Sequence, residues 1–140
     1  MRKTLFTVVI ALALASDAYW ASGQYGAPPG YEAESAALRR LKEQARALAR
    51  ADGCPDSETC RAAPLGERPC GGPSGFIIYC RLTTDEPALR RKIAEVTQAE
   101  KAFNAKWQEL SDCRLVSPPP LASTRETCGI DLRSLQPSPR

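Results

Sequence analysis

Apolar residues recur at helical spacing in two separate stretches of this chain. The first stretch, 33–51, carries them three or four positions apart: Leu38, Leu41, Ala45 and Leu48. The longer stretch, 86–111, shows the same alternation: Leu89, Ile93, Val96, Phe103, Trp107 and Leu110. Residues at this spacing share one face of an α-helix, so both stretches are predicted helices with one apolar side. Gly53 is placed to end the first helix, and Thr84 or Asp85 can cap the second.

The segments outside these helices carry different signals. Residues 54–75 are rich in glycine and proline, which excludes a helix and predicts a loop. Residues 76–82 are mostly β-branched or aromatic and predict one strand. Alternation along that strand would turn one set of side chains inward: Phe76, Ile78, Cys80 and Leu82. After Cys113 the chain is predicted to be irregular, with Ile130–Leu135 as its last ordered stretch and 136–140 frayed.

Together these elements predict a mainly α fold. The two helices would form an antiparallel hairpin with the three-four spacing of a coiled coil. Their long connecting loop would be stapled by disulfides, with at most a small β element near 76–82. A single domain, 33–135, is expected, preceded by a flexible segment at 19–32, which glycine and proline punctuate.

The first eighteen residues have the layout of a cleavable export signal. Two cations, Arg2 and Lys3, precede a predominantly apolar run at 5–15, and small residues follow. The run is shorter than the roughly 20 residues that span a bilayer. Cleavage is expected after Ala18, with earlier and later small-residue sites as alternatives. The form of the signal is bacterial, so the periplasm or the medium is the predicted destination.

The cysteines indicate how so small a protein is stabilised. All six follow the predicted cleavage site: Cys54, Cys60, Cys70, Cys80, Cys113 and Cys128. An even number of cysteines in an exported chain predicts disulfides, but six cysteines allow 15 pairings and the sequence does not choose among them. The two-residue spacing of zinc or redox motifs is absent, and so is histidine. We therefore expect structural disulfides, no metal and no cofactor.

Composition narrows the classes of function. Removal of residues 1–18, which include Arg2, Lys3 and Asp17, changes the formal charge from +3 to +2. That charge is too small to indicate a nucleic-acid partner, and no second apolar run could span a membrane. Without histidine, no catalytic triad based on it can be built, so we predict that the protein is not an enzyme.

Three carboxylates of the second helix leave a catalytic alternative open. Glu95 and Glu109 are expected to be surface charges, although a carboxylate-dependent enzyme would need one such acid. Glu100 occupies the one polar slot in the apolar series. It could meet an arginine of the first helix and fix the pairing of the helices, but we expect it to face water beyond the shorter helix.

Candidate binding residues lie on both helices. Phe103 and Trp107 either line a groove beside the long helix, where a partner would dock, or belong to the hairpin core. Arg39, Arg46 and Arg50 make the first helix basic, which would suit an anionic partner or would simply form a solvated face.

One local sequence pattern resembles that of a known group of proteins. The run Cys70-Gly71-Gly72-Pro73 is followed by an aliphatic strand ending in Tyr79 and by a long helix closing on Ser111-Asp112-Cys113. This layout resembles small exported bacterial cysteine-rich proteins of unassigned function. The resemblance covers residues 54–128, and it implies no activity and no functional residue.

The sequence thus predicts a non-catalytic periplasmic or secreted protein that binds another macromolecule, most simply a protein of the cell envelope or exterior. One alternative is an exported inhibitor of a hydrolytic enzyme, with loop 61–75 as its inhibitory edge, because a rigid loop loses little freedom on binding. The other is the carboxylate-dependent enzyme.

Overall fold

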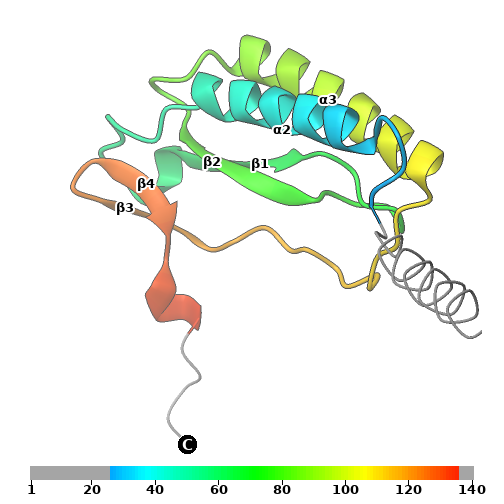
Figure 1. Cartoon of the computed structure of the whole chain (residues 1–140). Coiled ribbons are helices and arrows are strands. Elements are labelled where there is room, and N and C mark those ends of the chain that lie inside the picture. Colours follow the sequence, from blue (N-terminus) through cyan, green and yellow to red (C-terminus); the bar gives the residue numbers. More distant parts are fainter. Residues whose placement is uncertain (1–25, 136–140) are drawn as a thin grey trace, which may run out of the picture.

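A computed structural model describes residues 26–135 of the chain (Figure 1). The predicted signal peptide, its cleavage site, the first part of the predicted flexible segment and the C-terminal residues 136–140 lie outside this range. The elements follow in the order α2 (Tyr31–Leu48), η2 (Ser57–Thr59), β1 (Cys60–Leu65), β2 (Gly75–Cys80), α3 (Glu86–Trp107), β3 (Leu121–Thr124), β4 (Thr127–Ile130) and η3 (Leu132–Leu135).

The fold is mixed α/β, so the prediction of a mainly α protein is wrong. Two antiparallel hairpins, β1–β2 and β3–β4, form two separate two-stranded sheets. The helices α2 and α3 lie side by side, run in opposite directions and cover one face of β1–β2 (Figure 1). The paired helices were expected, but they pack on a sheet that the sequence analysis reduced to a single strand.

The helix ends differ from the predicted ones by a few residues. α2 begins at Tyr31, inside the segment predicted to be flexible, and it ends at Leu48, well before Gly53. α3 begins as predicted, because the Asp85 side chain accepts a hydrogen bond of 3.0 Å from the Ala88 N–H. It ends at Trp107 rather than at residue 111, since Gln108 adopts a left-handed backbone conformation with φ 52°.

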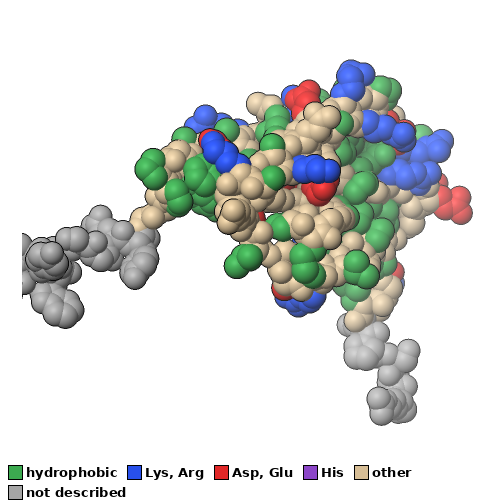
Figure 2. Space-filling view, turned by 90° about the vertical axis from the view of Figure 1, so that its right-hand side faces the viewer, with side chains coloured by type: hydrophobic (Ala, Val, Ile, Leu, Met, Phe, Trp, Pro, Cys, Tyr) green, Lys and Arg blue, Asp and Glu red, His purple; other side chains and the backbone are tan. Residues whose placement is uncertain are grey.

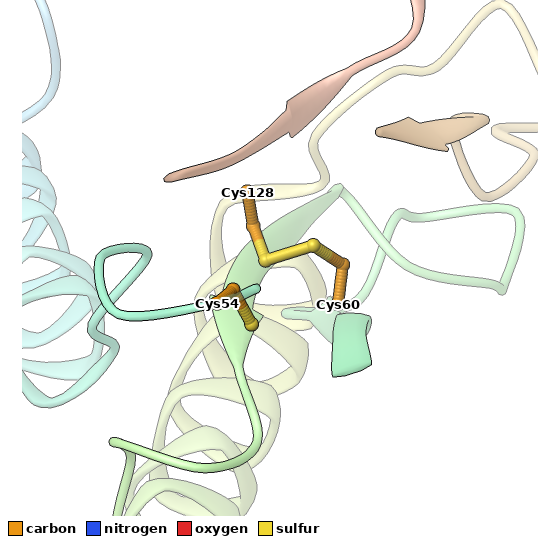
Figure 3. A group of neighbouring side chains, drawn as sticks. All are labelled: Cys54, Cys60 and Cys128. Atoms are coloured by element: carbon orange, nitrogen blue, oxygen red, sulfur yellow. A yellow bond between two sulfur atoms is a disulfide. The ribbon is translucent and has the colours of Figure 1, made fainter. Parts of the chain in front are cut away.

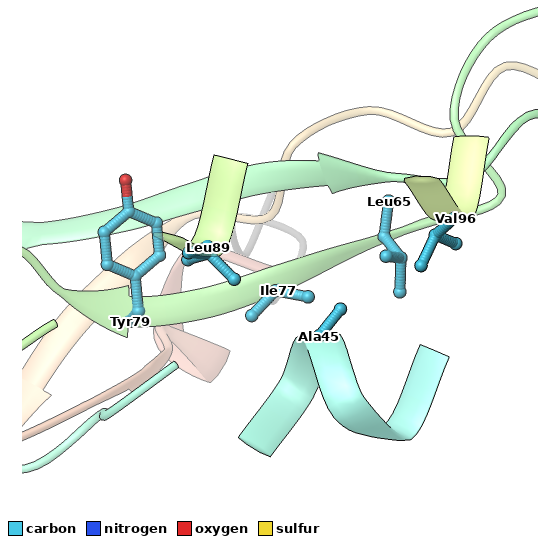
Figure 4. Close-up of a cluster of buried hydrophobic side chains, with 6 residues drawn as sticks. All are labelled: Ala45, Leu65, Ile77, Tyr79, Leu89 and Val96. Atoms are coloured by element: carbon cyan, nitrogen blue, oxygen red, sulfur yellow. The ribbon is translucent and has the colours of Figure 1, made fainter. Parts of the chain in front are cut away.

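The main core lies between the helices and the β1–β2 hairpin. It consists of six buried side chains (Figure 4): Ala45, Leu65, Ile77, Tyr79, Leu89 and Val96. The opposite face of β2 is also covered, because Ile78 and Cys80 pack in a second cluster with the other buried cysteines. The expectation of one inward face at 76–82 is therefore wrong: both faces of β2 pack, and Leu82 lies beyond the strand and is 56% exposed.

All six cysteines form disulfides, as predicted, and the structure supplies their pairing. The bonds join Cys54 to Cys80, Cys60 to Cys128 and Cys70 to Cys113. The first two lie together in the buried cluster, where they tie β1 and β2 to β4 and to the chain after α2. Figure 3 shows the bond between Cys60 and Cys128, with Cys54 beside it. The third is exposed and joins the β1–β2 loop to the segment after α3.

Neither helix of the described residues has the length and apolar character needed to cross a bilayer.

Candidate functional site: a disulfide-pinned end

One end of the molecule gathers segments that are distant in the sequence. The β1–β2 loop, residues 66–74, lies there against residues 108–115, which follow α3, and the start of α2 is close by (Figure 1). The Cys70–Cys113 disulfide crosslinks the loop to the segment. We call the loop 66–74 together with residues 108–115 the pinned end.

Two side chains of α3 hold the loop, mainly through its main chain. The Glu100 carboxylate accepts hydrogen bonds from the Glu67 N–H (3.0 Å) and the Ser74 hydroxyl (2.8 Å). One helical turn later, the Asn104 amide donates to the Glu67 C=O at 2.6 Å. The loop approaches α3 so closely that a Cβ at Gly66 would lie 1.8 Å from a Glu100 oxygen, and Gly66 also has a φ of +73°. This position therefore requires glycine.

Glu100 is buried, so the expectation that it faces water is wrong. Its side chain is 11% exposed and forms an ion pair with Lys42 of α2, whose side chain is 20% exposed. The interhelical contact that the sequence left open does form, but with a lysine rather than an arginine. Glu100 thus joins three elements: α3, α2 and the loop of the pinned end.

Arg68 fixes the loop to the other half of the pinned end. Its guanidinium donates to the Arg114 C=O (2.6 Å) and the Ser111 hydroxyl (3.0 Å), and it forms an ion pair with Asp112. Hydrogen bonds from Arg114 and then from Arg68 hold the pKa of the Asp112 carboxyl below its usual value of 3.8. The segment after α3, although irregular, is therefore tied to the loop by a disulfide and by several charge-assisted bonds.

Two leucines stand almost fully in solvent on this tied segment. Leu110 is 96% exposed and Leu115 is 97% exposed. Leu110 was expected on the apolar face of the second helix, but α3 ends before it. Figure 2 faces this end of the molecule and shows hydrophobic side chains at the surface among basic ones. Leu110 and Leu115 are the two most exposed of the large hydrophobic residues in the described part of the chain, and both lie on a constrained backbone, which would lose little freedom on binding.

Phe103 and Trp107 lie beside the pinned end, in an aromatic cluster with Tyr31. The Tyr31 ring centroid is 5.3 Å from that of Phe103 and 5.4 Å from that of Trp107. The Trp107 indole donates to Glu34 at 3.0 Å, and the Tyr31 hydroxyl donates to Glu109 at 2.9 Å. The half-buried rings therefore join the start of α2 to the end of α3. Phe103 also lines a groove of about 410 Å³ between the two helices.

The three candidate arginines of the first helix do not join this site. Arg39 and Arg46 project from the exposed side of α2, where Arg39 donates to the Ser35 hydroxyl. Arg50 lies beyond α2 and pairs with Asp52 at 3.4 Å. Its main chain bonds to Thr84, just before the start of α3, so it lies at the end of the helix pair opposite Trp107.

The three carboxylates of the catalytic alternative have different partners. Glu95 pairs with Lys92 on the surface of α3, Glu109 accepts from Tyr31, and Glu100 is held between Lys42 and the loop.

The sulfur atoms of Cys54, Cys60 and Cys128 lie within 4.8 Å of one another. Because each of these cysteines is in a disulfide, the group offers no thiolate to a metal ion.

Comparison with protein-family models, curated proteins and solved structures gave no match. The candidate site therefore comes from the geometry of this chain. Sequence analysis assigned no contact to two of its main contributors, Arg68 and Asn104, and it quoted Asp112 only as part of the Ser111-Asp112-Cys113 run. Only the polar slot at Glu100 and the glycines and cysteine of the loop gave a signal in the sequence.

Proposed function

We propose that this chain is an exported, non-catalytic protein that binds another protein through the pinned end. One observation carries the proposal: Leu110 and Leu115 are almost fully exposed on a segment held by the Cys70–Cys113 disulfide and Arg68. Burial of an exposed leucine in a partner's pocket is favourable by about 1.5–3 kcal/mol. Since the backbone is already constrained, little of that gain is lost to ordering on binding.

Export is supported by two independent features. Three disulfides persist in oxidising compartments and are rare in the bacterial cytosol. The basic and apolar pattern of residues 1–18 is that of a cleavable signal peptide, which would leave the six cysteines in the mature chain. We infer the periplasm or the medium as the place of action.

A non-catalytic role is supported by the chemistry of the side chains. The sequence contains no histidine. The three acids of the catalytic alternative, Glu95, Glu100 and Glu109, each already contact a donor group. Arg39, Arg46 and Arg50 are not part of the pinned end, so binding of an anionic partner through them is a separate prediction.

Inhibition of a hydrolytic enzyme is the form of protein binding that the rigid loop favours. The inhibitory edge must be narrower than residues 61–75, because 61–65 belong to β1 and Leu65 is buried. The exposed tip at Pro69 to Gly72 remains available, next to the Cys70–Cys113 disulfide. An inhibitor would lose potency when Pro69 is changed, whereas an adaptor that binds through the leucines alone would not.

Affinity capture from an envelope fraction under oxidising conditions tests the proposal. The mature chain and a Leu110→Ser/Leu115→Ser variant serve as baits, with Leu82→Ser as the matched control, because Leu82 is exposed but lies away from the pinned end. We expect the double variant to lose specific partners that wild type and Leu82→Ser retain. Identical recovery by all three baits would contradict the proposed surface, and assay of a captured hydrolase would test the inhibitor form.

A further inference from the structure

A second groove runs along the free edge of β1, away from the pinned end. It has a volume of about 400 Å³ and is lined by four consecutive residues of β1, by one residue of β2 and by one side of α3: Arg61, Ala62, Ala63, Pro64, Tyr79, Leu89, Arg90 and Ile93. Consecutive strand residues alternate between the two faces of a sheet. A groove that touches all four therefore follows the edge of the strand, with α3 as its second wall. We call it the edge groove.

The edge groove exposes unpaired main-chain groups. Within residues 26–135, β1 pairs with β2 alone. The Thr59 C=O accepts from the Arg81 N–H at 3.1 Å, and Pro64 has no N–H to donate. In an antiparallel pair, every second residue directs both its N–H and its C=O toward the partner strand. Thr59 is such a residue and Pro64 is not, so the odd-numbered residues of β1 face β2 and the even-numbered ones face the free edge. The N–H and C=O of Ala62 and the C=O of Pro64 therefore point to the free edge.

Two cations stand together at one end of the edge groove. Arg61 is held there because its guanidinium donates to the C=O groups of Glu58 (2.5 Å) and Cys60 (2.8 Å). Arg90 has only a loose ion pair with Glu86, at 3.8 Å. Arg61 is opposite Tyr79 in the β1–β2 register. The Tyr79 hydroxyl donates to the Glu86 carboxylate at 2.8 Å, and this is the carboxylate that pairs with Arg90, so Arg90 lies at the same end of the groove. The remainder of the groove is formed by alanine, proline, leucine and isoleucine.

We propose that the edge groove binds the C-terminal segment of a peptide or protein as an added strand, antiparallel to β1. The peptide main chain pairs with Ala62, its alternate apolar side chains rest on the partly exposed Ile93, and its terminal carboxylate is bound by Arg61 and Arg90. A chain terminus fits better than an acidic side chain, because the two cations lie at the end of the edge rather than along it. Main-chain pairing supplies affinity, and the pocket on α3 supplies selectivity.

The experiment uses the oxidised mature chain and an immobilised library of random hexapeptides with free C-terminal carboxylates. The same library ending in amides, and one with amides and an added C-terminal aspartate, are run in parallel. We expect binding to carboxylate-ended peptides that are apolar at alternate positions, at least about tenfold weaker binding on amidation, and no rescue by the aspartate side chain. Amide chemical shifts should move at Ala62 and Ala63 when the best hexapeptide is added.

Two variants test the two halves of the proposal. Arg90→Gln should weaken binding of the best hexapeptide at least about tenfold, whereas Arg91→Gln, its exposed neighbour outside the groove, should not change it. Ala62→Pro removes the outward N–H but no hydrogen bond to β2, so it should abolish binding while leaving the thermal melt close to wild type. If that variant does not fold, the two arginine variants still decide the matter.

Four results would overturn the inference. One is a library without any binder, and another is binding that is indifferent to amidation or to Arg90→Gln. The third is a concentration-dependent dimer that Ala62→Pro disrupts, because a second copy of β1 would then occupy the edge. Chemical shifts that move at Leu110 and Leu115 instead would assign the peptide to the pinned end.

Discussion

Replacing Glu100 with alanine should weaken the attachment of loop 66–74 to α3, leaving the Asn104 contact in place, and lower the free energy of unfolding by about 2–4 kcal/mol. The carboxylate accepts from the Glu67 N–H and the Ser74 hydroxyl and pairs with Lys42. A hydrogen bond to a charged group is worth about 1.5–3 kcal/mol, and loss of one partner of a buried ion pair costs about 3–5 kcal/mol. The upper figure is reduced here, because the Lys42 side chain is 20% exposed and can reach water.

Two further variants separate the contributions. Glu100→Gln keeps an acceptor oxygen but loses the ion pair, so it should lower the free energy of unfolding by about 1–2 kcal/mol. Glu95→Ala is the matched control, since Glu95 pairs with Lys92 on the surface of the same helix, where such a pair is worth about 0–1 kcal/mol. Urea unfolding of the oxidised proteins, followed by circular dichroism, measures all three. The reasoning fails if Glu100→Ala and Glu95→Ala destabilise equally.

Three other outcomes follow from the same structure. Gly66→Ala should destabilise more than Gly71→Ala in the same urea assay, because both glycines have positive φ but only a Cβ at Gly66 meets other atoms. The double variant Cys70→Ser/Cys113→Ser should lower the free energy of unfolding by about 4 kcal/mol, because the bond closes a loop with a sequence separation of 43. In the wild-type protein, alkylation followed by mass spectrometry should show that this exposed bond is reduced before the two buried ones. The pKa of the Asp112 carboxyl lies below 3.8 in the folded protein, so its contribution to stability is present above that pH and is lost as the pH falls through the folded value. On acid titration, Asp112→Asn should therefore lose less stability than the wild-type protein.

Local signals predicted the helices well and most of the strands poorly. The start of α3 was predictable, because its cap and first turn are encoded in adjacent residues. β1 was missed because its Ala62-Ala63-Pro64 run has little intrinsic preference for a strand. This run becomes a strand because it pairs with β2. The β3–β4 hairpin was missed because its turn places Arg125 and Glu126 at φ of 52° and 59°, without the glycine or asparagine that usually signals such a turn.

The candidate site was harder to predict, because its contacts are not local. The helical pattern placed Glu100 on the inner face of its helix, but its partners Lys42, Glu67 and Ser74 come from α2 and from the loop.

Disulfide pairing could not be predicted from the sequence for the same reason. Cys60 and Cys80 are directly opposite each other in the β1–β2 ladder, yet each bonds to a cysteine of another segment. Spacing along the chain carries no information on such a choice.

Peptide mapping of the protein purified from exporting cells, without reduction, tests the central claim most directly. The account predicts a mature N-terminus near residue 19 and three linked peptide pairs, among them Cys70 with Cys113, which holds the pinned end together. Free thiols at these two positions in the folded protein, or Cys70 bonded to any other cysteine, would contradict it.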